Sequence, residues 1–174
     1  MKSAFNGDIA GQVRNDESIT RSILIINGVN LNLLGKREVA IYGNTLFEEQ
    51  LSQWKALYLT FSIDYFQSNE EDAIVKKIQE AEKKHTAIVI NGGAFTHTSI
   101  AIADAIRAIT IPAIEVHISN IYAREEYRKK SFLSPVCKGS IVGLGLDSYR
   151  LAIEHVINVS LEHYDDKQKK VRST

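Results

Sequence analysis

Short apolar runs alternate with longer amphipathic runs from residue 22 onward, and this alternation organises most of the chain. The short runs are rich in β-branched residues, as expected for strands that are buried on both faces of a sheet. They cover residues 22–27, 59–66, 86–91, 112–118 and 139–144. We therefore predict that these runs are the strands of one sheet and that the segments between them are crossover helices.

The longer runs repeat apolar residues at helical spacing, which predicts helices with one buried face. Asn69 precedes an acidic first turn and is expected to cap one helix, while Asp147 is expected to begin the last one. The apolar series are Phe47, Leu51, Trp54 and Tyr58, then Ile74, Ile78 and Ala81, then Ile102, Ile106 and Ile109.

This order of elements predicts an α/β fold, a flavodoxin-like three-layer sandwich with a parallel sheet of about five strands. Ligands of such sheets bind outside the carboxyl ends of the strands, where the strand order reverses. Polar loops follow the first, third and fourth strands, at residues 27–32, 91–99 and 115–128. Because the predicted topology makes these strands neighbours, we expect the three loops to surround one crevice.

The length of 174 residues and the hydrophobic content of 44% fit a single domain, which we place at residues 22–164. Polar composition predicts a tail over residues 1–21 and a frayed tail over residues 165–174. The first twenty residues lack the apolar middle of a secretory signal, and no run approaches the ~20 apolar residues of a membrane span.

Charge and cysteine content restrict the partners and the compartment. The chain has 21 basic and 21 acidic residues, so no net charge draws it toward nucleic acid or an anionic membrane, and neither partner is expected. Cys137 is the single cysteine and cannot form an internal disulfide, which fits a reducing compartment. We therefore expect a cytoplasmic protein.

The segment between Gly35 and Gly43 is typical of a flexible lid that carries reactive groups. Tyr42 alone is compatible with an ordinary loop aromatic, because a phenol is protonated near neutral pH. Arg37 precedes it by five residues, and a guanidinium within a few Å favours the phenolate. With a second arginine from across the crevice, Tyr42 becomes a candidate general base.

The loop after the third strand contains a Gly-Gly pair that would let backbone approach a ligand, and Thr96 or Thr98 is expected to cap the helix that follows. His97 and Asp104 lie seven residues apart and would share a helix face if the helix began near His97. The alternative is a capping loop with a surface histidine and a solvated aspartate.

Glu115 and His117 are two residues apart in a strand, so their side chains project from the same face. A carboxylate beside an imidazole fixes its tautomer and favours its protonated form, which suits a proton donor. A buried histidine satisfied by its neighbour is an equal alternative. Arg124 and Arg128 would share a face if their segment were helical and would then clamp a carboxylate; otherwise they are solvated charges.

A metal site is the rival use of these histidines and carboxylates. The sequence contains no HExxH motif and no dense acidic cluster, and the Glu115–His117 pair is better explained as a tuned donor. Nucleotide binding is disfavoured as well, because the glycine-rich stretch at residues 92–99 matches neither common phosphate-binding pattern.

Three stretches, INGVNLNLLGKREVAIYG, INGGAFTHTSIAIADAI and PAIEVHISNIYAREEYRKKSFLSPVCKGSIVGLGLDSYRLAI, together resemble the type II 3-dehydroquinate dehydratases. The resemblance covers about residues 22–157. It implies a hydro-lyase that converts 3-dehydroquinate to 3-dehydroshikimate in the shikimate pathway by anti elimination through an enolate. It implies neither a metal nor an organic cofactor.

The resemblance also implies how the chemistry is divided. Tyr42 matches the catalytic base, Arg37 matches an arginine that assists it, and Arg124 matches a second arginine that favours its phenolate form. Asn30 matches the asparagine that holds the enolate oxygen through an ordered water.

His117 matches the general acid that protonates the departing hydroxyl, with Glu115 positioned behind it. Arg128 is implied to bind a substrate hydroxyl, and Ile118 and Ser119 to bind the substrate carboxylate. The full set of implied substrate-binding positions is Asn91, Gly93, His97, Asp104, Ile118, Ser119 and Arg128.

Members of this family are known as trimers assembled into dodecamers, so the resemblance implies a homo-oligomer. Val29 stands where the family usually has proline, which removes a restraint next to Asn30. Two alternatives stay open at this point: a non-catalytic flavodoxin-like module that binds small carboxylic acids, and a homologue diverted to a related hydroxy acid or a regulatory role. The sequence also leaves open whether the reaction serves biosynthesis or quinate breakdown.

Overall fold

The computed structural model describes residues 21–34 and 47–172, and side chains as far as residue 160. Strands and helices alternate along the chain, with short 3-10 turns (η) after several strands. The elements are β1 (Ser22–Asn27), η1 (Leu31–Leu33), α2 (Phe47–Leu57), β2 (Ser62–Gln67), α3 (Glu71–Ala81), β3 (Ala87–Asn91), η2 (Gly93–His97), α4 (Ile100–Ala108), β4 (Ala113–His117), η3 (Ile121–Ala123), η4 (Glu126–Arg128), η5 (Ser134–Val136), β5 (Gly139–Val142) and α5 (Asp147–Arg172).

The five strands form one sheet in the order β2-β1-β3-β4-β5, and every neighbouring pair is parallel. The order reverses between β1 and β3, whose last residues, Asn27 and Asn91, are partners in register. The predicted α/β flavodoxin-like sandwich is therefore confirmed. The carboxyl ends of β1 and β3 are therefore where a ligand is expected to bind.

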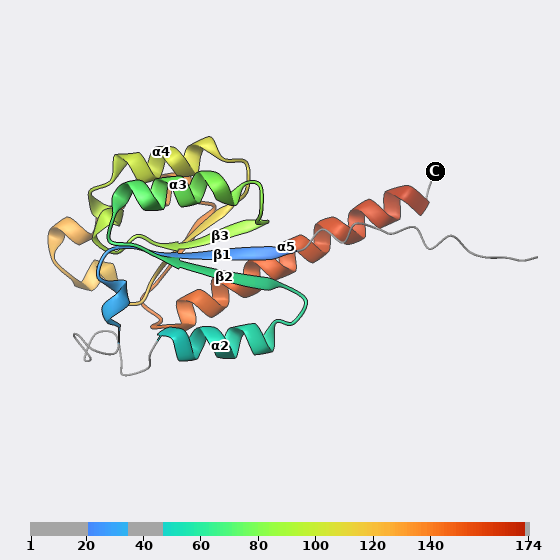
Figure 1. Cartoon of the computed structure of the whole chain (residues 1–174), viewed down its shortest axis with the longest axis horizontal. Helices are drawn as coiled ribbons and strands as arrows, with labels where there is room; N and C mark the ends of the chain where they lie inside the picture. The colour runs from blue at the N-terminus through green and yellow to red at the C-terminus, as the bar shows by residue number, and fades with distance from the viewer. Residues whose placement is uncertain (1–20, 35–46, 173–174) are drawn as a thin grey trace, which may run out of the picture.

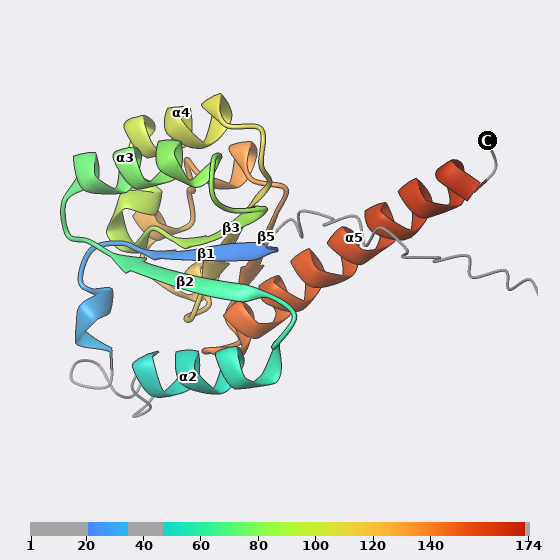
Figure 2. The ribbon, with the colours of Figure 1, turned by 45° about the vertical axis from the view of Figure 1, so that its right-hand side comes forward.

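Helices cover both faces of the sheet, with α3 and α4 on one side and α2 and α5 on the other (Figures 1 and 2). Alternate residues of β1 serve the two sides. Ile23 and Ile25 pack in the cluster with α2 and α5, whereas Leu24 and Ile26 pack in the cluster with α3 and α4. A strand used in this way must be apolar at every position, which explains its uninterrupted hydrophobic run.

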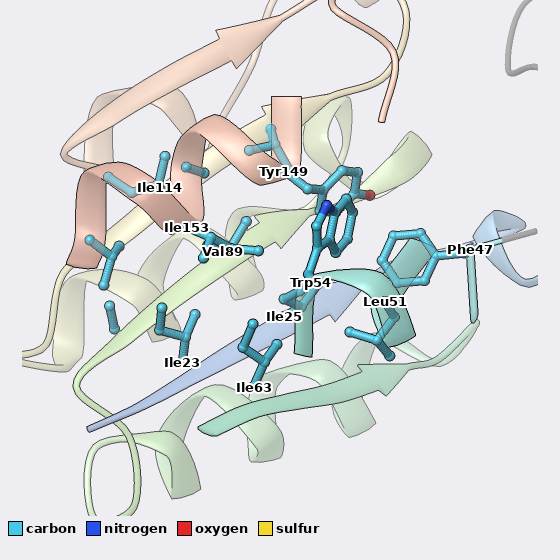
Figure 3. Packing of buried hydrophobic residues seen from close by; sticks show 14 of the residues in the cluster. Ile23, Ile25, Phe47, Leu51, Trp54, Ile63, Val89, Ile114, Tyr149 and Ile153 are labelled. Atoms are coloured by element: carbon cyan, nitrogen blue, oxygen red, sulfur yellow. The ribbon is translucent and has the colours of Figure 1, made fainter. Parts of the chain in front are cut away.

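Three aromatic rings pack together in the core between the sheet and the α2–α5 face, beside aliphatic side chains (Figure 3). Trp54 of α2 stacks on Tyr149 of α5 with ring centroids 5.8 Å apart, and Phe47 meets the Tyr149 ring edge-on at 5.1 Å. All three side chains are almost completely buried. Aromatic pairs of this kind add ~0.5–1.5 kcal/mol beyond their area burial, so they hold α2 and α5 together against the sheet.

Two strand and cap predictions are wrong in detail. The second strand begins at Ser62 rather than residue 59, because Leu59 lies in an exposed turn after α2. Asn69 does not cap α3; Glu70 takes that position without a side-chain bond, and Asn69 Oδ1 instead accepts the backbone N–H of Asn30 at 2.9 Å. The amide of Asn69 therefore fixes the loop after β1, a partner that local sequence does not reveal.

The cap of α4 also differs from the prediction. Ser99 is the N-cap, and its Oγ accepts the N–H of Ile102 at 2.9 Å, so neither Thr96 nor Thr98 caps this helix. The hydroxyl of Thr98 donates back to the Ala94 carbonyl at 3.3 Å. As a result, the residues of η2 precede the helix and do not share its face.

The last helix begins at Asp147, as predicted, and its backbone stays helical to Arg172. The frayed segment expected at residues 165–174 is therefore helical over most of its length. This stretch contains no glycine or proline to end a helix, and it extends away from the sheet (Figures 1 and 2). In the part of the chain that the structure describes, no helix is long and apolar enough to cross a membrane.

Candidate active site

The loops that follow β1 and β3 touch through their backbones at the switch point. Gly28 donates its N–H to the Asn91 carbonyl at 2.7 Å, and a Cβ at Gly28 would lie 2.1 Å from the carbonyl oxygen of Gly92. Gly93 has a φ of +58°, and a Cβ there would lie 2.7 Å from the carbonyl oxygen of Val29. Gly28 and Gly93 therefore allow the close contact between the two loops. The approach of the Gly92–Gly93 backbone to a ligand stays a prediction.

A chain of buried hydrogen bonds connects these loops to Tyr149 of α5. The Tyr149 hydroxyl donates to Asn27 Oδ1 at 2.7 Å and accepts from Asn91 Nδ2 at 2.8 Å. Asn91 Oδ1 in turn accepts the N–H of Gly93 at 3.2 Å. Burial raises the pKa of the Tyr149 phenol, so the hydroxyl stays a donor. Tyr149 was not singled out in the sequence, where it resembles any other core aromatic of a helix.

Glu115 and His117 form a buried pair at the end of β4, with Nε2 of His117 3.0 Å from Oε1 of Glu115. The Glu115 side chain is completely buried, and the His117 side chain is only 6% exposed. The sequence placed both side chains on one face of a strand, and the structure confirms that they meet. In the described residues, no other group bonds the second ring nitrogen of His117.

Serine hydroxyls complete the surroundings of the Glu115 carboxylate. Ser131 donates to Oε1 at 2.6 Å, and Ser140 and Ser134 both bond Oε2, the former at 2.6 Å. Burial alone would raise the pKa of Glu115, but the bonds from His117 and the serines outweigh it and lower the pKa to about 2. Glu115 is therefore a carboxylate anion near neutral pH, and His117 donates to it through Nε2–H.

His97 lies beside this pair. Its ring centroid is 6.3 Å from that of His117, the planes are 17° apart, and its Nδ1 is 2.8 Å from the Lys130 carbonyl oxygen. A carbonyl accepts only, so His97 carries its proton on Nδ1. Burial, together with the charges of His117 and Arg128, lowers the pKa of His97 despite the bond to Lys130. Two histidines, one from η2 and one from the end of β4, thus lie side by side.

Arg124 directly follows the 3-10 turn η3 and Arg128 ends η4, so their segment is not the helix that was considered. Both guanidinium groups pair with the same carboxylate, since Nε of Arg124 is 3.4 Å and Nε of Arg128 3.0 Å from Glu125 Oε2. Their side chains are 15% and 24% exposed, so they are not freely solvated charges. Glu125 therefore holds the two arginines together beside the carboxyl end of β4.

Asp104 does not join His97. Its side chain on α4 is 63% exposed and pairs with Arg107 one turn later. The helix begins at Ile100, after His97, so the shared helix face does not form. Among the described residues, no group of three or more His, Cys, Asp or Glu side chains comes together in a way that would hold a metal ion.

The remaining expected positions in the described residues follow the carboxyl ends of β1 and β4. Asn30 is exposed in a left-handed conformation, with φ of 65°, directly after β1. Ile118 is buried and accepts the N–H of Gly145 through its carbonyl at 2.9 Å, and Ser119 follows it in a half-buried position. Arg37 and Tyr42, the activator and base expected in the lid, lie outside the described residues.

Comparisons with known proteins agree on one family. Residues 21–157 match the family described as dehydroquinase class II. A 3-dehydroquinate dehydratase of Clostridium botulinum (strain Hall) is 55% identical over 139 residues, covering 79% of this chain and 95% of the relative. The 3-dehydroquinate dehydratase of Rhizobium johnstonii is 48% identical over 144 residues, covering 82% of this chain and 99% of the relative.

A solved structure supports the same assignment. The crystal structure of type II dehydroquinase from Butyrivibrio crossotus superimposes with a TM-score of 0.76 at 47% identity, covering 78% of this chain and 97% of that one. Family, relatives and fold thus agree with the resemblance carried by the three sequence stretches. The chain therefore belongs to the class II dehydroquinases.

Proposed function

We propose that this protein removes water from 3-dehydroquinate to give 3-dehydroshikimate by anti elimination through an enolate. Membership of the family and the names of the relatives support the dehydration and its place in the shikimate pathway. The observation that carries the mechanism is the buried Glu115–His117 pair at the switch-point edge of the sheet. Such a pair is suited to delivering a proton to a leaving hydroxyl.

The acid step belongs to His117. The Glu115 carboxylate accepts Nε2–H, so Nδ1 is the nitrogen that gives its proton to the departing hydroxyl. The hydroxyl leaves as water, and the electron pair of the enolate re-forms the ketone, conjugated to the new double bond. His97, at 6.3 Å between ring centroids, lies within reach of a ring substituent of the same substrate.

The base step belongs to Tyr42, with Arg37 and Arg124 favouring its phenolate. Tyr42 removes a proton beside the ketone, and the negative charge passes to the ketone oxygen as an enolate. In anti elimination the proton and the hydroxyl leave from opposite faces of the ring, so base and acid must come from different parts of the protein. Tyr42 precedes α2 and His117 ends β4, which fits this requirement.

Substrate binding is assigned to the groups around the strand ends. Asn30 holds the enolate oxygen through a water, and Ile118 and Ser119 bind the substrate carboxylate. The hydroxyl groups of the substrate bind to Arg128, His97 and the loop that contains Asn91 and Gly93. Both amide atoms of Asn91 already bond within the protein, so it acts mainly by shaping this loop. Asp104 is exposed, so we assign it a substrate contact at the outer rim of the site.

We further propose that the protein is a cytoplasmic homo-oligomer, a dodecamer assembled from trimers. The resemblance to the family supports the assembly, and the lone cysteine supports a reducing compartment. Sedimentation measured across a range of protein concentrations tests the assembly. A stable monomer would contradict it.

A direct assay tests the reaction. Purified protein is mixed with 3-dehydroquinate, and the conjugated enone of 3-dehydroshikimate is followed by ultraviolet absorbance with and without a chelator. We expect the enone to form at the same rate in both samples. We also expect borohydride with substrate to leave the enzyme active, because the mechanism has no imine. No enone from folded protein would refute the proposal and favour the non-catalytic binding module.

A further inference from the structure

Residues 130 and 131 bond His97 and the carboxylate that holds His117. The carbonyl of Lys130 accepts Nδ1–H of His97 at 2.8 Å. The next residue, Ser131, donates its hydroxyl to Glu115 Oε1 at 2.6 Å, and the same oxygen accepts Nε2–H of His117 at 3.0 Å. Consecutive residues therefore bond to one histidine directly and to the other through its carboxylate.

We propose that Ser131 is a positioning residue for the acid step, because its hydroxyl holds Oε1 of Glu115 in the orientation that accepts Nε2–H of His117 and so keeps the proton of neutral His117 on Nε2. Nδ1 is then the nitrogen that exchanges a proton with substrate. The inference rests on the proposed role of His117 as the general acid. It adds a residue that neither the sequence nor the resemblance singled out.

The other hydrogen bonds of Ser131 determine that its hydroxyl donates to Glu115. Its Oγ accepts the backbone N–H of Leu133 at 3.0 Å and of Ser134 at 2.9 Å. A serine hydroxyl has two lone pairs and one proton, so both lone pairs are occupied and the proton points to Oε1 of Glu115. Ser131 can therefore donate to a carboxylate but cannot accept a proton from a carboxylic acid at this position.

Ser134 and Ser140 bond the other carboxylate oxygen, Oε2, and not the oxygen that accepts from His117. Ser140 is exposed, and its hydroxyl lies 2.6 Å from Glu115 Oε2 and 3.1 Å from Ser134 Oγ, so water can replace it. Ser131 is half-buried and lies two residues before Leu133, which is fully buried. Loss of the Ser131 hydroxyl leaves Oε1 with His117 as its one remaining donor among the described residues.

Other ionisable groups near the pair do not compete with this effect close to neutral pH. Burial, and then the charge of Glu115, raise the pKa of Cys137 to about 12, so its thiol stays neutral. Burial lowers the pKa of His97, which favours its neutral form. A tautomer change at His117 in a Ser131 variant therefore reports on Glu115.

The test is nitrogen-15 NMR of the histidine rings at pH 8, with kinetics on the same samples. The variants are Ser131→Ala, Ser131→Thr, which keeps the hydroxyl, and Ser52→Ala as the matched control. Ser52 lies on the exposed part of α2, where its hydroxyl donates to the Glu48 carbonyl. The His117 signal is assigned with His117→Ala.

We expect wild-type His117 as the Nε2–H tautomer. Ser131→Ala should give a mixture of tautomers and lower kcat about tenfold, with KM changed less than about threefold. Ser131→Thr should retain the tautomer, with kcat within about threefold of wild type, and Ser52→Ala should match wild type.

An Nδ1–H tautomer in wild type, or a Ser131→Ala variant with wild-type tautomer and kcat, would overturn the proposal. If Ser131→Ala does not fold, the proposal is tested by the His117 tautomer of the wild type and by the tautomer and kcat of Ser131→Thr. A wild-type protein without dehydratase activity would refute the proposed function alone, because the tautomer measurement needs no turnover.

Discussion

The imidazole ring centroids of His97 and His117 lie 6.3 Å apart and the rings are within 17° of parallel, although His97 follows β3 and His117 ends β4. Each ring is held through a different nitrogen, His97 through Nδ1 by a backbone carbonyl and His117 through Nε2 by a carboxylate. We therefore expect the two histidines to have different roles. Burial lowers the pKa of His97, which favours its neutral form, and the carboxylate beside His117 suits the proposed proton donor.

Removal of the His117 ring should slow loss of the hydroxyl more than removal of the proton beside the ketone. We expect His117→Ala to lower kcat by about 10²–10⁴, because a positioned general acid contributes that much. Deuterium exchange beside the ketone, followed by NMR in heavy water, should persist in the variant. Equal losses of exchange and dehydration would argue against a separate acid.

Tyr42→Phe should abolish proton abstraction and leave binding intact. The variant lacks the phenol that we assign as base, so both exchange and turnover should fall by about 10²–10⁴. Affinity for 3-dehydroshikimate, measured by calorimetry, should change little. Tyr58→Phe serves as the control, since the Tyr58 hydroxyl bonds Glu154 outside the site. Retained turnover in Tyr42→Phe would remove this residue as the base.

Glu115 makes stability depend on acid pH. Its pKa falls from the ordinary 4.5 to about 2 in the folded protein, so the unfolded chain binds more protons in this interval. The contribution, about 3 kcal/mol, is fully present above pH 4.5 and is lost as the pH falls toward 2. Urea unfolding of Glu115→Gln at several pH values should show lower stability at pH 7 and a weaker slope in the acid range.

The exposed Glu49→Gln variant should keep the wild-type slope, because Glu49 lies on the surface of α2. An unchanged slope in Glu115→Gln would show that this buried carboxylate is not the group responsible.

The contact between the loops after β1 and β3 should not tolerate a side chain. Gly28→Ala places a Cβ 2.1 Å from the Gly92 carbonyl oxygen, so we expect a loss of at least about 2 kcal/mol in unfolding free energy. Gly139→Ala is the matched control, since nothing lies within 4 Å of its Cβ position. Equal stability of the two variants in denaturant would contradict the close approach.

Tyr149→Phe should leave Asn27 and Asn91 without the hydroxyl that joins them. Because both amides are buried, we expect a cost of about 1–3 kcal/mol. Tyr58→Phe should cost less, since its hydroxyl bonds Glu154 near the surface. Thermal unfolding of the two variants compares them, and a Tyr149→Phe protein as stable as Tyr58→Phe would show that the network contributes little.

Much of the fold follows from the sequence because buried parallel strands must be apolar throughout. Residues 22–27 were predicted as a strand with the bounds that the structure gives. The caps were less predictable. Asn69 is an acceptable cap for α3, but its side chain is used in a tertiary contact, and Ser99 caps α4 where Thr96 or Thr98 was expected. Asn69 bonds Asn30 across 39 positions of sequence, which no local pattern contains.

The site shows the same division. Glu115 and His117 were predicted to meet because strand geometry places alternate residues on one face. Ser131 was missed because it approaches Glu115 through an irregular loop, where spacing carries no information. The residues alone made Tyr42 a candidate base with Arg37 as its activator and left an ordinary loop tyrosine as the alternative, and the resemblance to a family supplied the choice between them.

The most direct measurement of the mechanism is the fate of a single deuterium. 3-Dehydroquinate is labelled beside the ketone on the face opposite the departing hydroxyl, and the 3-dehydroshikimate formed by the enzyme is examined by mass spectrometry. Anti elimination by a base and an acid on opposite faces predicts that the deuterium is lost to solvent. Product that retains the deuterium would contradict the account.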